Sequence, residues 1–251
     1  SLGCFLIAFI NLWYKYAELT LQIKRISSLT NSLAELMGYK RVSLNWTIIV
    51  HEDESLTSEK RFNIQSYREL SEIVLWRDEY PGLENNTPQV NNDYMYPCLP
   101  KTPNGEKIKV ISEVYYHKRK IVYGIKFNPA LPKNSMVEII TKPIIYPKGS
   151  LEPDAYYENI KKEKGKAITY ITIVPTGKII MEIKLPENKE YLALAPHNRY
   201  CAVSPMDTDD FIEEKTREIN CERVTPNIFK VTIDNPSLFY EYSFFWKDVD
   251  K

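Results

Sequence analysis

The residues best placed for acid–base or metal chemistry follow the first predicted strand. His51 and Asp53 are two positions apart, and residues with this spacing share one face of an extended strand. An imidazole beside a carboxylate can act as an acid–base couple or bind a divalent metal. Residues 51–54 are all polar, however, and we favour the simpler interpretation of a solvated turn after a buried strand.

A second acidic group lies in the C-terminal third of the chain. Its members are Asp207, Asp209, Asp210, Glu213 and Glu214. Carboxylates suit a divalent cation, but the alternating ligands and central glycine of a calcium loop are absent. Acidic residues also stabilise the first turn of a helix, so we expect a short helix near 207–219, capped by Asp207 or Thr208. A metal-dependent hydrolase using His51, Asp53 and this cluster is an alternative hypothesis.

The cysteines and glycines add no chemical signature. The four cysteines are Cys4, Cys98, Cys201 and Cys221, and no pair has the C-x-x-C spacing of a zinc site. Cys201 and Cys221 could form a disulfide, although two free thiols are the preferred interpretation. The chain contains no G-x-S-x-G and no glycine-rich phosphate loop. We therefore predict no catalytic residue, no cofactor and no resident metal.

The composition disfavours nucleic-acid binding and favours β structure. The 33 basic and 33 acidic residues give no net charge, whereas nucleic-acid binders usually carry a basic excess. The 18 tyrosines suit half-buried pleated surfaces.

The N-terminal segment has the clearest periodicity. Its apolar residues follow a repeating spacing of four and three, interrupted only by Thr30: they are Phe5, Phe9, Leu12, Tyr16, Leu19, Ile23, Ile26, Leu33 and Met37. This is the a/d spacing of a coiled coil, and we call these nine residues the apolar seam. Gly38 is predicted to end the helix, which gives a helical segment 1–38. We expect it to form a homo-oligomer, with packing on the protein's own sheet as the alternative.

The first part of this segment has a second interpretation. Residues 2–13 are almost wholly apolar, but a helix needs about 20 residues to cross a bilayer. In this second interpretation they are the end of a membrane span. Lys15, Lys24 and Arg25 would then place the body in the cytoplasm. The predicted location is membrane-associated with a cytoplasmic body, or cytoplasmic.

The rest of the chain alternates in a pattern typical of strands. The first predicted set is 43–50, 60–65, 73–76, 107–116, 120–127 and 136–146, and the second is 167–174, 178–185, 191–195, 200–203, 227–233 and 239–246. We expect Pro175-Thr176-Gly177 to be the loop of a hairpin, and the last two strands to form an aromatic hairpin. Helices do not separate the strands, which argues against a parallel α/β sheet.

The predicted fold is mainly β with an N-terminal α-helix. It consists of a helical stalk followed by two antiparallel, immunoglobulin-like β-sandwich modules, 40–148 and 167–251, joined by a linker at 149–166.

This organisation predicts a non-enzymatic sensor, adaptor or receptor-like module. It would oligomerise through its helix and bind a ligand or protein partner through sandwich loops. The long loop 78–106 and the C-terminal hairpin are the surfaces to test first. A structural or surface-assembly subunit with edge-to-edge strand pairing is a further alternative.

Overall fold

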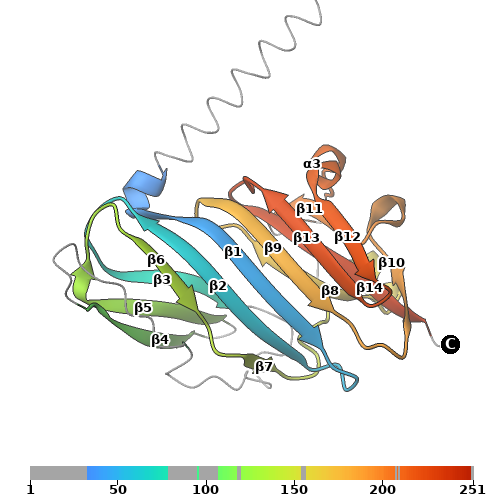
Figure 1. Ribbon diagram of the computed structural model, residues 1–251. Coiled ribbons are helices and arrows are strands. Elements are labelled where there is room, and N and C mark those ends of the chain that lie inside the picture. Colours follow the sequence, from blue (N-terminus) through green and yellow to red (C-terminus); the bar gives the residue numbers. More distant parts are fainter. Residues whose placement is uncertain are drawn as a thin grey trace, which may run out of the picture.

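A computed structural model describes residues 33–78, 95, 107–117, 120–153, 157–206, 208 and 210–249. The described part is mainly β, as predicted, and its strands form three sheets (Figure 1). The helical positions from Phe5 to Ile26 and the apolar residues 2–13 lie outside it. So does most of the predicted loop 78–106, of which Met95 is buried and forms an isolated β-bridge with Thr141.

The largest sheet has seven strands. They are β1 (Tyr39–Val50), β2 (Leu56–Ser66), β6 (Met136–Ile140), β7 (Ile144–Tyr146), β9 (Thr176–Lys184), β12 (Asn220–Thr225) and β13 (Ile228–Asp234). The order across the sheet is β12-β13-β9-β1-β2-β6, and β7 also pairs with β2. Alternate residues of β2 are buried, including Phe62 and Ile64, because period-two alternation places them on one face.

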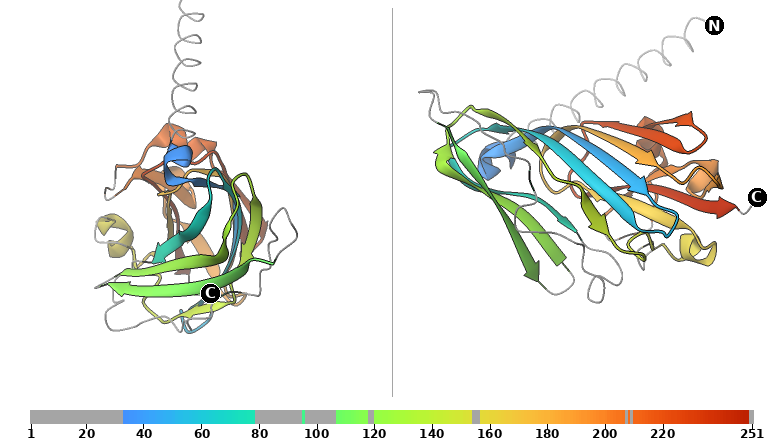
Figure 2. Two further views of the ribbon diagram at one scale, coloured as in Figure 1. Left: turned by 90° about the vertical axis from the view of Figure 1, so that its left-hand side faces the viewer. Right: turned by 60° about the horizontal axis from the view of Figure 1, so that its bottom comes forward.

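Two smaller sheets cover that face. One is ordered β3 (Leu70–Asp78), β5 (Lys120–Leu131), β4 (Lys109–His117); the other has β14 (Tyr240–Val249) paired with β8 (Lys166–Ile171), β10 (Glu190–Ala193) and β11 (Cys201–Pro205). Phe62 stacks on Trp76 of β3 at 5.6 Å between ring centroids, and Phe229 of β13 contacts Phe244 of β14 at 5.1 Å. Figures 1 and 2 show the two smaller sheets on the same side of the large one.

This arrangement corrects the prediction of antiparallel pairing throughout two sandwich modules. β1 and β9 pair in parallel, and Leu44 lies beside Ile179. One seven-stranded sheet therefore contains strands from both sides of residues 149–166, and a continuous hydrophobic core reaches all three sheets. The predicted linker is itself packed: it contains α2 (Glu158–Lys162) and buries Leu151 and Ile160.

Both predicted hairpins of the C-terminal half are wrong. β8 pairs with β14, whereas β9 pairs with β1 and β13, so Pro175-Thr176-Gly177 leads from one sheet into another. The turn after β13 likewise carries the chain from the large sheet to β14. Most of β14 is buried, because it is the central strand of its sheet, so it does not offer the exposed surface that we expected.

The predicted helix at 207–219 is shorter in the structure. Helix α3 covers Glu213–Glu218, with Ile212 rather than Asp207 or Thr208 at its N-cap. The backbone N–H of Ile212 donates to the carbonyl of Val203 at 2.7 Å. This hydrogen bond holds the chain against β11 (Cys201–Pro205) until residue 212, so the helix begins only after it.

The end of the N-terminal helix is described and lies on the body. Residues 33–37 are helical, and Gly38 ends the helix with φ at +85° and hydrogen bonds from its N–H to the carbonyls of Ala34 and Glu35. A glycine is suited to this left-handed conformation. Ala34 is buried and Met37 packs against the core. Within the described residues, no helix is long and apolar enough to span a membrane.

Candidate functional site

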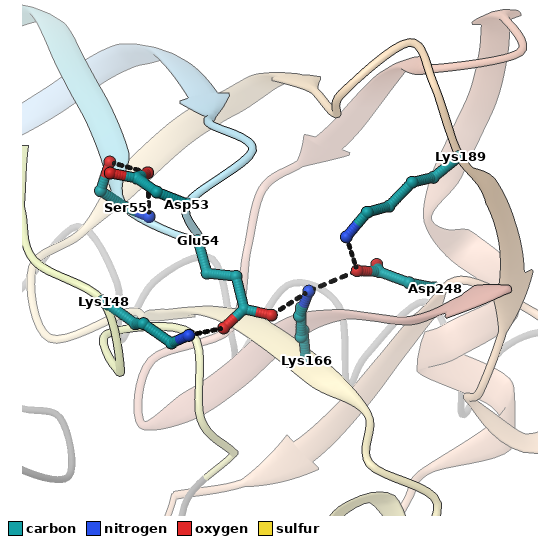
Figure 3. Close-up of polar contacts among 7 residues, drawn as sticks. All are labelled: Asp53, Glu54, Ser55, Lys148, Lys166, Lys189 and Asp248. Atoms are coloured by element: carbon teal, nitrogen blue, oxygen red, sulfur yellow. Dashed lines mark hydrogen bonds and ion pairs between the residues drawn. The ribbon is translucent and has the colours of Figure 1, made fainter. Parts of the chain in front are cut away.

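A network of charged side chains connects the ends of several strands (Figure 3). The carboxylate of Glu54 lies between Lys148 and Lys166, at 3.3 and 3.0 Å. Asp248 lies between Lys166 and Lys189, at 2.5 and 2.9 Å. Lys166 therefore bridges the two carboxylates, and we call these five residues the charged network.

The network brings together segments that are far apart in the sequence. Glu54 belongs to the turn between β1 and β2 and has a left-handed backbone, with φ at +67°. Lys166 begins β8, Lys189 precedes β10 and Asp248 lies near the end of β14. The contacts join the turn of the large sheet to the four-stranded sheet.

The lysines lower the pKa of both acids. The hydrogen bond from Lys166 is the main cause of the lowered pKa of Glu54. For Asp248, burial alone would raise the pKa, but the hydrogen bonds from Lys166 and Lys189 outweigh burial and lower it. Both carboxylates are thus held in the charged form.

His51 and Asp53 lie in the same turn but do not form a couple. The Nε2 atom of His51 is 2.8 Å from the hydroxyl of Thr57. Asp53 accepts hydrogen bonds from the backbone N–H and the hydroxyl of Ser55, at 3.0 and 2.6 Å, and the hydroxyl bond is the main cause of its lowered pKa. Each side chain therefore has a separate partner within the turn.

The second acidic group lies elsewhere. Helix α3 contains Glu213, which pairs with Arg217 and is 3.6 Å from the Nε2 atom of His197. In Figure 1 this helix and the β1–β2 turn are at opposite ends of the strands. Across the described residues, no group of three or more His, Cys, Asp or Glu side chains could hold a metal ion. Among the described residues, His51 and Asp53 do not converge with the acids of α3; Asp207 and Asp209 lie outside the described residues.

Several buried polar residues were not predicted from the sequence. Lys60 is 3% exposed, and its Nζ atom lies 4.5 Å from the ring centroid of Trp76 and 4.8 Å from that of Trp46. The alternation of β2 could have indicated this position, because Lys60 shares a face with Phe62. The hydroxyl of Tyr157 donates to the buried carboxylate of Glu241 at 2.7 Å. The pKa of Tyr157 is raised, mainly because the side chain is buried.

The predicted oligomerisation residues are described only at their C-terminal end. Leu33 is partly buried and Met37 contacts the core, whereas Leu36, off the seam, is 74% exposed. The last turn thus packs on the protein's own body. Phe5, Phe9, Leu12, Tyr16, Leu19, Ile23 and Ile26 lie outside the described residues.

No protein-family model matches the chain, and no curated protein matches its sequence. Solved structures with some likeness include a candidate protease from Parabacteroides distasonis ATCC 8503, with a TM-score of 0.45 and 11% identity over 83% of this chain and 40% of that one. An M1 zinc metallopeptidase from Deinococcus radiodurans has a TM-score of 0.39 and 9% identity over 82% of this chain and 42% of that one. The chain spans about two fifths of their length, and likeness at this level carries no information about activity.

Proposed function

We propose that the chain is a non-enzymatic adaptor or receptor-like module. In this proposal the N-terminal segment associates copies of the chain, and the β body presents loops to a ligand or protein partner. The observation that carries the proposal is the junction at Gly38, where the helix passes directly into β1, an interior strand of the large sheet.

The junction supports a role in orienting the body. Ala34 is 1% exposed, the backbone N–H of Tyr67 donates to the carbonyl of Gly38 at 2.7 Å, and a guanidinium N–H of Arg68 donates to the carbonyl of Met37 at 3.4 Å. These contacts hold the last helical turn against the residues that follow β2. If the apolar seam associates copies of the chain, this fixed turn would set how their bodies are oriented.

The charged network supports the second half of the proposal. Loops on a rigid β scaffold commonly carry binding residues, as in immunoglobulin-like sandwiches. Here the charged network joins the β1–β2 turn to the four-stranded sheet by ion pairs, and the side chain of Lys148 is 74% exposed. A partner with charged groups of both signs fits this surface.

Self-association is tested by sedimentation velocity on the full chain across a concentration series. Leu19→Glu combined with Ile23→Glu places two charges on the seam, and we expect it to convert an oligomer into a monomer. Leu21→Glu is the control, since this charge falls on another face of the predicted helix and should leave the oligomer intact. A wild-type chain that is monomeric at every concentration would refute the proposal.

The two alternatives have weaker support. Edge-to-edge assembly would use an exposed strand such as β12, but that strand carries Glu222 and Arg223 and has a bulge between Arg223 and Thr225. Charges and bulges on an edge strand oppose pairing with another chain. The metal-dependent hydrolase lacks support because His51, Asp53 and α3 do not converge.

A further inference from the structure

Two cysteine side chains from different layers are in contact inside the body. Cys201 is the first residue of β11 in the four-stranded sheet, and Cys221 lies on β12 at the edge of the large sheet. Both are free thiols; Cys201 belongs to the hydrophobic core and Cys221 packs against it, where the thiol of Cys201 interacts with the sulfur of Cys221. We propose that Cys201 and Cys221 form a reversible disulfide that cross-links the two layers.

The surrounding strands hold both thiols in place. Cys201 pairs with Phe244 of β14, and Cys221 pairs with Val231 of β13. The layers are in close contact beside them, because the ring of Tyr200 lies 4.6 Å from that of Phe229 and 5.4 Å from that of Phe244, between centroids. A disulfide requires that the two side chains be directed at each other. Cys201 belongs to the hydrophobic core between the layers and Cys221 packs against it, so both side chains face the interior from opposite layers.

The two thiols have different roles in the reaction. Cys201 is 4% exposed, whereas Cys221 is only partly buried on an edge strand. The hydrogen bond from Cys201 lowers the pKa of Cys221, and the same bond together with burial raises the pKa of Cys201. The thiolate is the reactive form, so Cys221 is the attacking group and Cys201 is the resolving thiol.

A low-molecular-weight disulfide such as oxidised glutathione is the oxidant. The Cys221 thiolate attacks one glutathione sulfur, the glutathione S–S bond breaks, and one glutathione thiolate leaves. Cys201 then loses its proton and attacks the sulfur of Cys221, which releases the second glutathione. Two protein thiols are oxidised by two electrons, one glutathione disulfide is reduced to two thiols, and the two protein protons pass to glutathione.

The cross-link would close a loop through residues 202–220, which include α3. It would restrain the unfolded chain and join β11 to β12. The charged surface of β12 would then be fixed to the four-stranded sheet by a covalent bond in oxidising conditions and by packing alone in reducing conditions.

The test uses the full chain carrying Cys4→Ser and Cys98→Ser, which leaves only this pair. After treatment with oxidised glutathione, denaturation and alkylation, we expect an intact mass lower by two hydrogens than that of the reduced protein, with neither cysteine alkylated. The melting temperature should rise by about 5–10 °C and return on reduction.

Single replacements in the same background separate the two roles. Cys201→Ser should accumulate one glutathione on Cys221, whereas Cys221→Ser should stay unmodified while folded. Two thiols that both remain alkylatable, a cross-link between chains, or a disulfide that appears only in denaturant would each overturn the proposal.

Discussion

Arg41 is a buried cation at the point where the three sheets meet. It is 1% exposed and belongs to β1; its guanidinium donates to the hydroxyl of Tyr170 in β8 at 2.6 Å and to the carbonyl of Leu75 in β3. It also lies over the ring of Phe62, 5.4 Å from the centroid. One side chain thus satisfies acceptors on both smaller sheets.

Replacing Arg41 should therefore destabilise the whole body. We expect Arg41→Ala to lower the free energy of unfolding by about 3–4 kcal/mol, because it leaves a cavity and removes the donor from two acceptors. Arg61→Ala is the control: Arg61 is half exposed and paired with Glu138 at 3.8 Å, so its loss should cost about 0.5 kcal/mol or less. Urea unfolding followed by circular dichroism measures both, and equal losses would contradict the assigned role.

Asp248 should make the stability depend on pH. Its lowered pKa means that the folded state favours the carboxylate, so the stabilisation is present above the ordinary carboxyl pKa and is lost as the pH falls through the lower folded value. We expect Asp248→Asn to cost about 1 kcal/mol at neutral pH. It should also flatten the decline in stability below about pH 4.

The matched control for this prediction is Asp234→Asn. Asp234 is 68% exposed and pairs with Lys178 at 3.3 Å, so its loss should change neither the stability nor its pH profile appreciably. Chemical unfolding at a series of pH values measures the profiles. A profile of Asp248→Asn parallel to that of the wild type would argue against the network.

Some residues of the site could be predicted from the local sequence pattern, whereas contacts between residues far apart in the sequence could not. The polar turn after β1 follows from its composition, and the alternation of β2 places Lys60 inward with Phe62. Lys166 ends the predicted linker 149–166, yet it is 16% exposed and forms ion pairs with two acids. Its partners are more than eighty residues away in the sequence, so the local sequence pattern cannot predict these contacts.

Gly177 shows the same limit for an element. The sequence Pro175-Thr176-Gly177 suggested a hairpin turn, but Gly177 lies where β9 enters the large sheet next to β1. A Cβ built on Gly177 would be 2.7 Å from the carbonyl oxygen of Val42, and the register of β1 shifts at that residue. The glycine permits a close approach of two backbones. Strand positions followed from alternation, whereas strand partners did not.

Gly177→Ala should consequently weaken the parallel β1–β9 contact. We expect a loss of about 2 kcal/mol, since a backbone carbonyl must move to admit the methyl group. Gly149→Ala tests the contrasting case: φ is +94° there, and a Cβ would meet only the carboxylate of Glu152, at 3.9 Å. It should cost about 1 kcal/mol from conformation alone. Thermal unfolding compares the two, and a loss at Gly177 below that at Gly149 would contradict the steric explanation.

At the scale of the whole molecule, the shared sheet predicts a single cooperative unit. β1 and β9 come from the two halves of the chain and pair along most of their length. The continuous core includes Phe62 from the first half and Phe229 from the second. Two separate modules would unfold independently, whereas elements that share a sheet and a core lose their stability together.

Phe62→Ala tests this unity, since Phe62 is fully buried on β2 in the first half. We expect a loss of about 3–5 kcal/mol from the cavity, and an equal fall in hydrogen-exchange protection in peptides from β2 and from β14. Val224→Ala on the edge strand is the control, as Val224 is 52% exposed and should change stability by no more than about 0.5 kcal/mol. Unchanged protection of β14 in Phe62→Ala would mean that the halves unfold separately despite their common sheet. An equal fall in protection in both halves would mean that the parallel β1–β9 pair makes them one folding unit. A force applied at the Gly38 junction would then reach the charged network through β1.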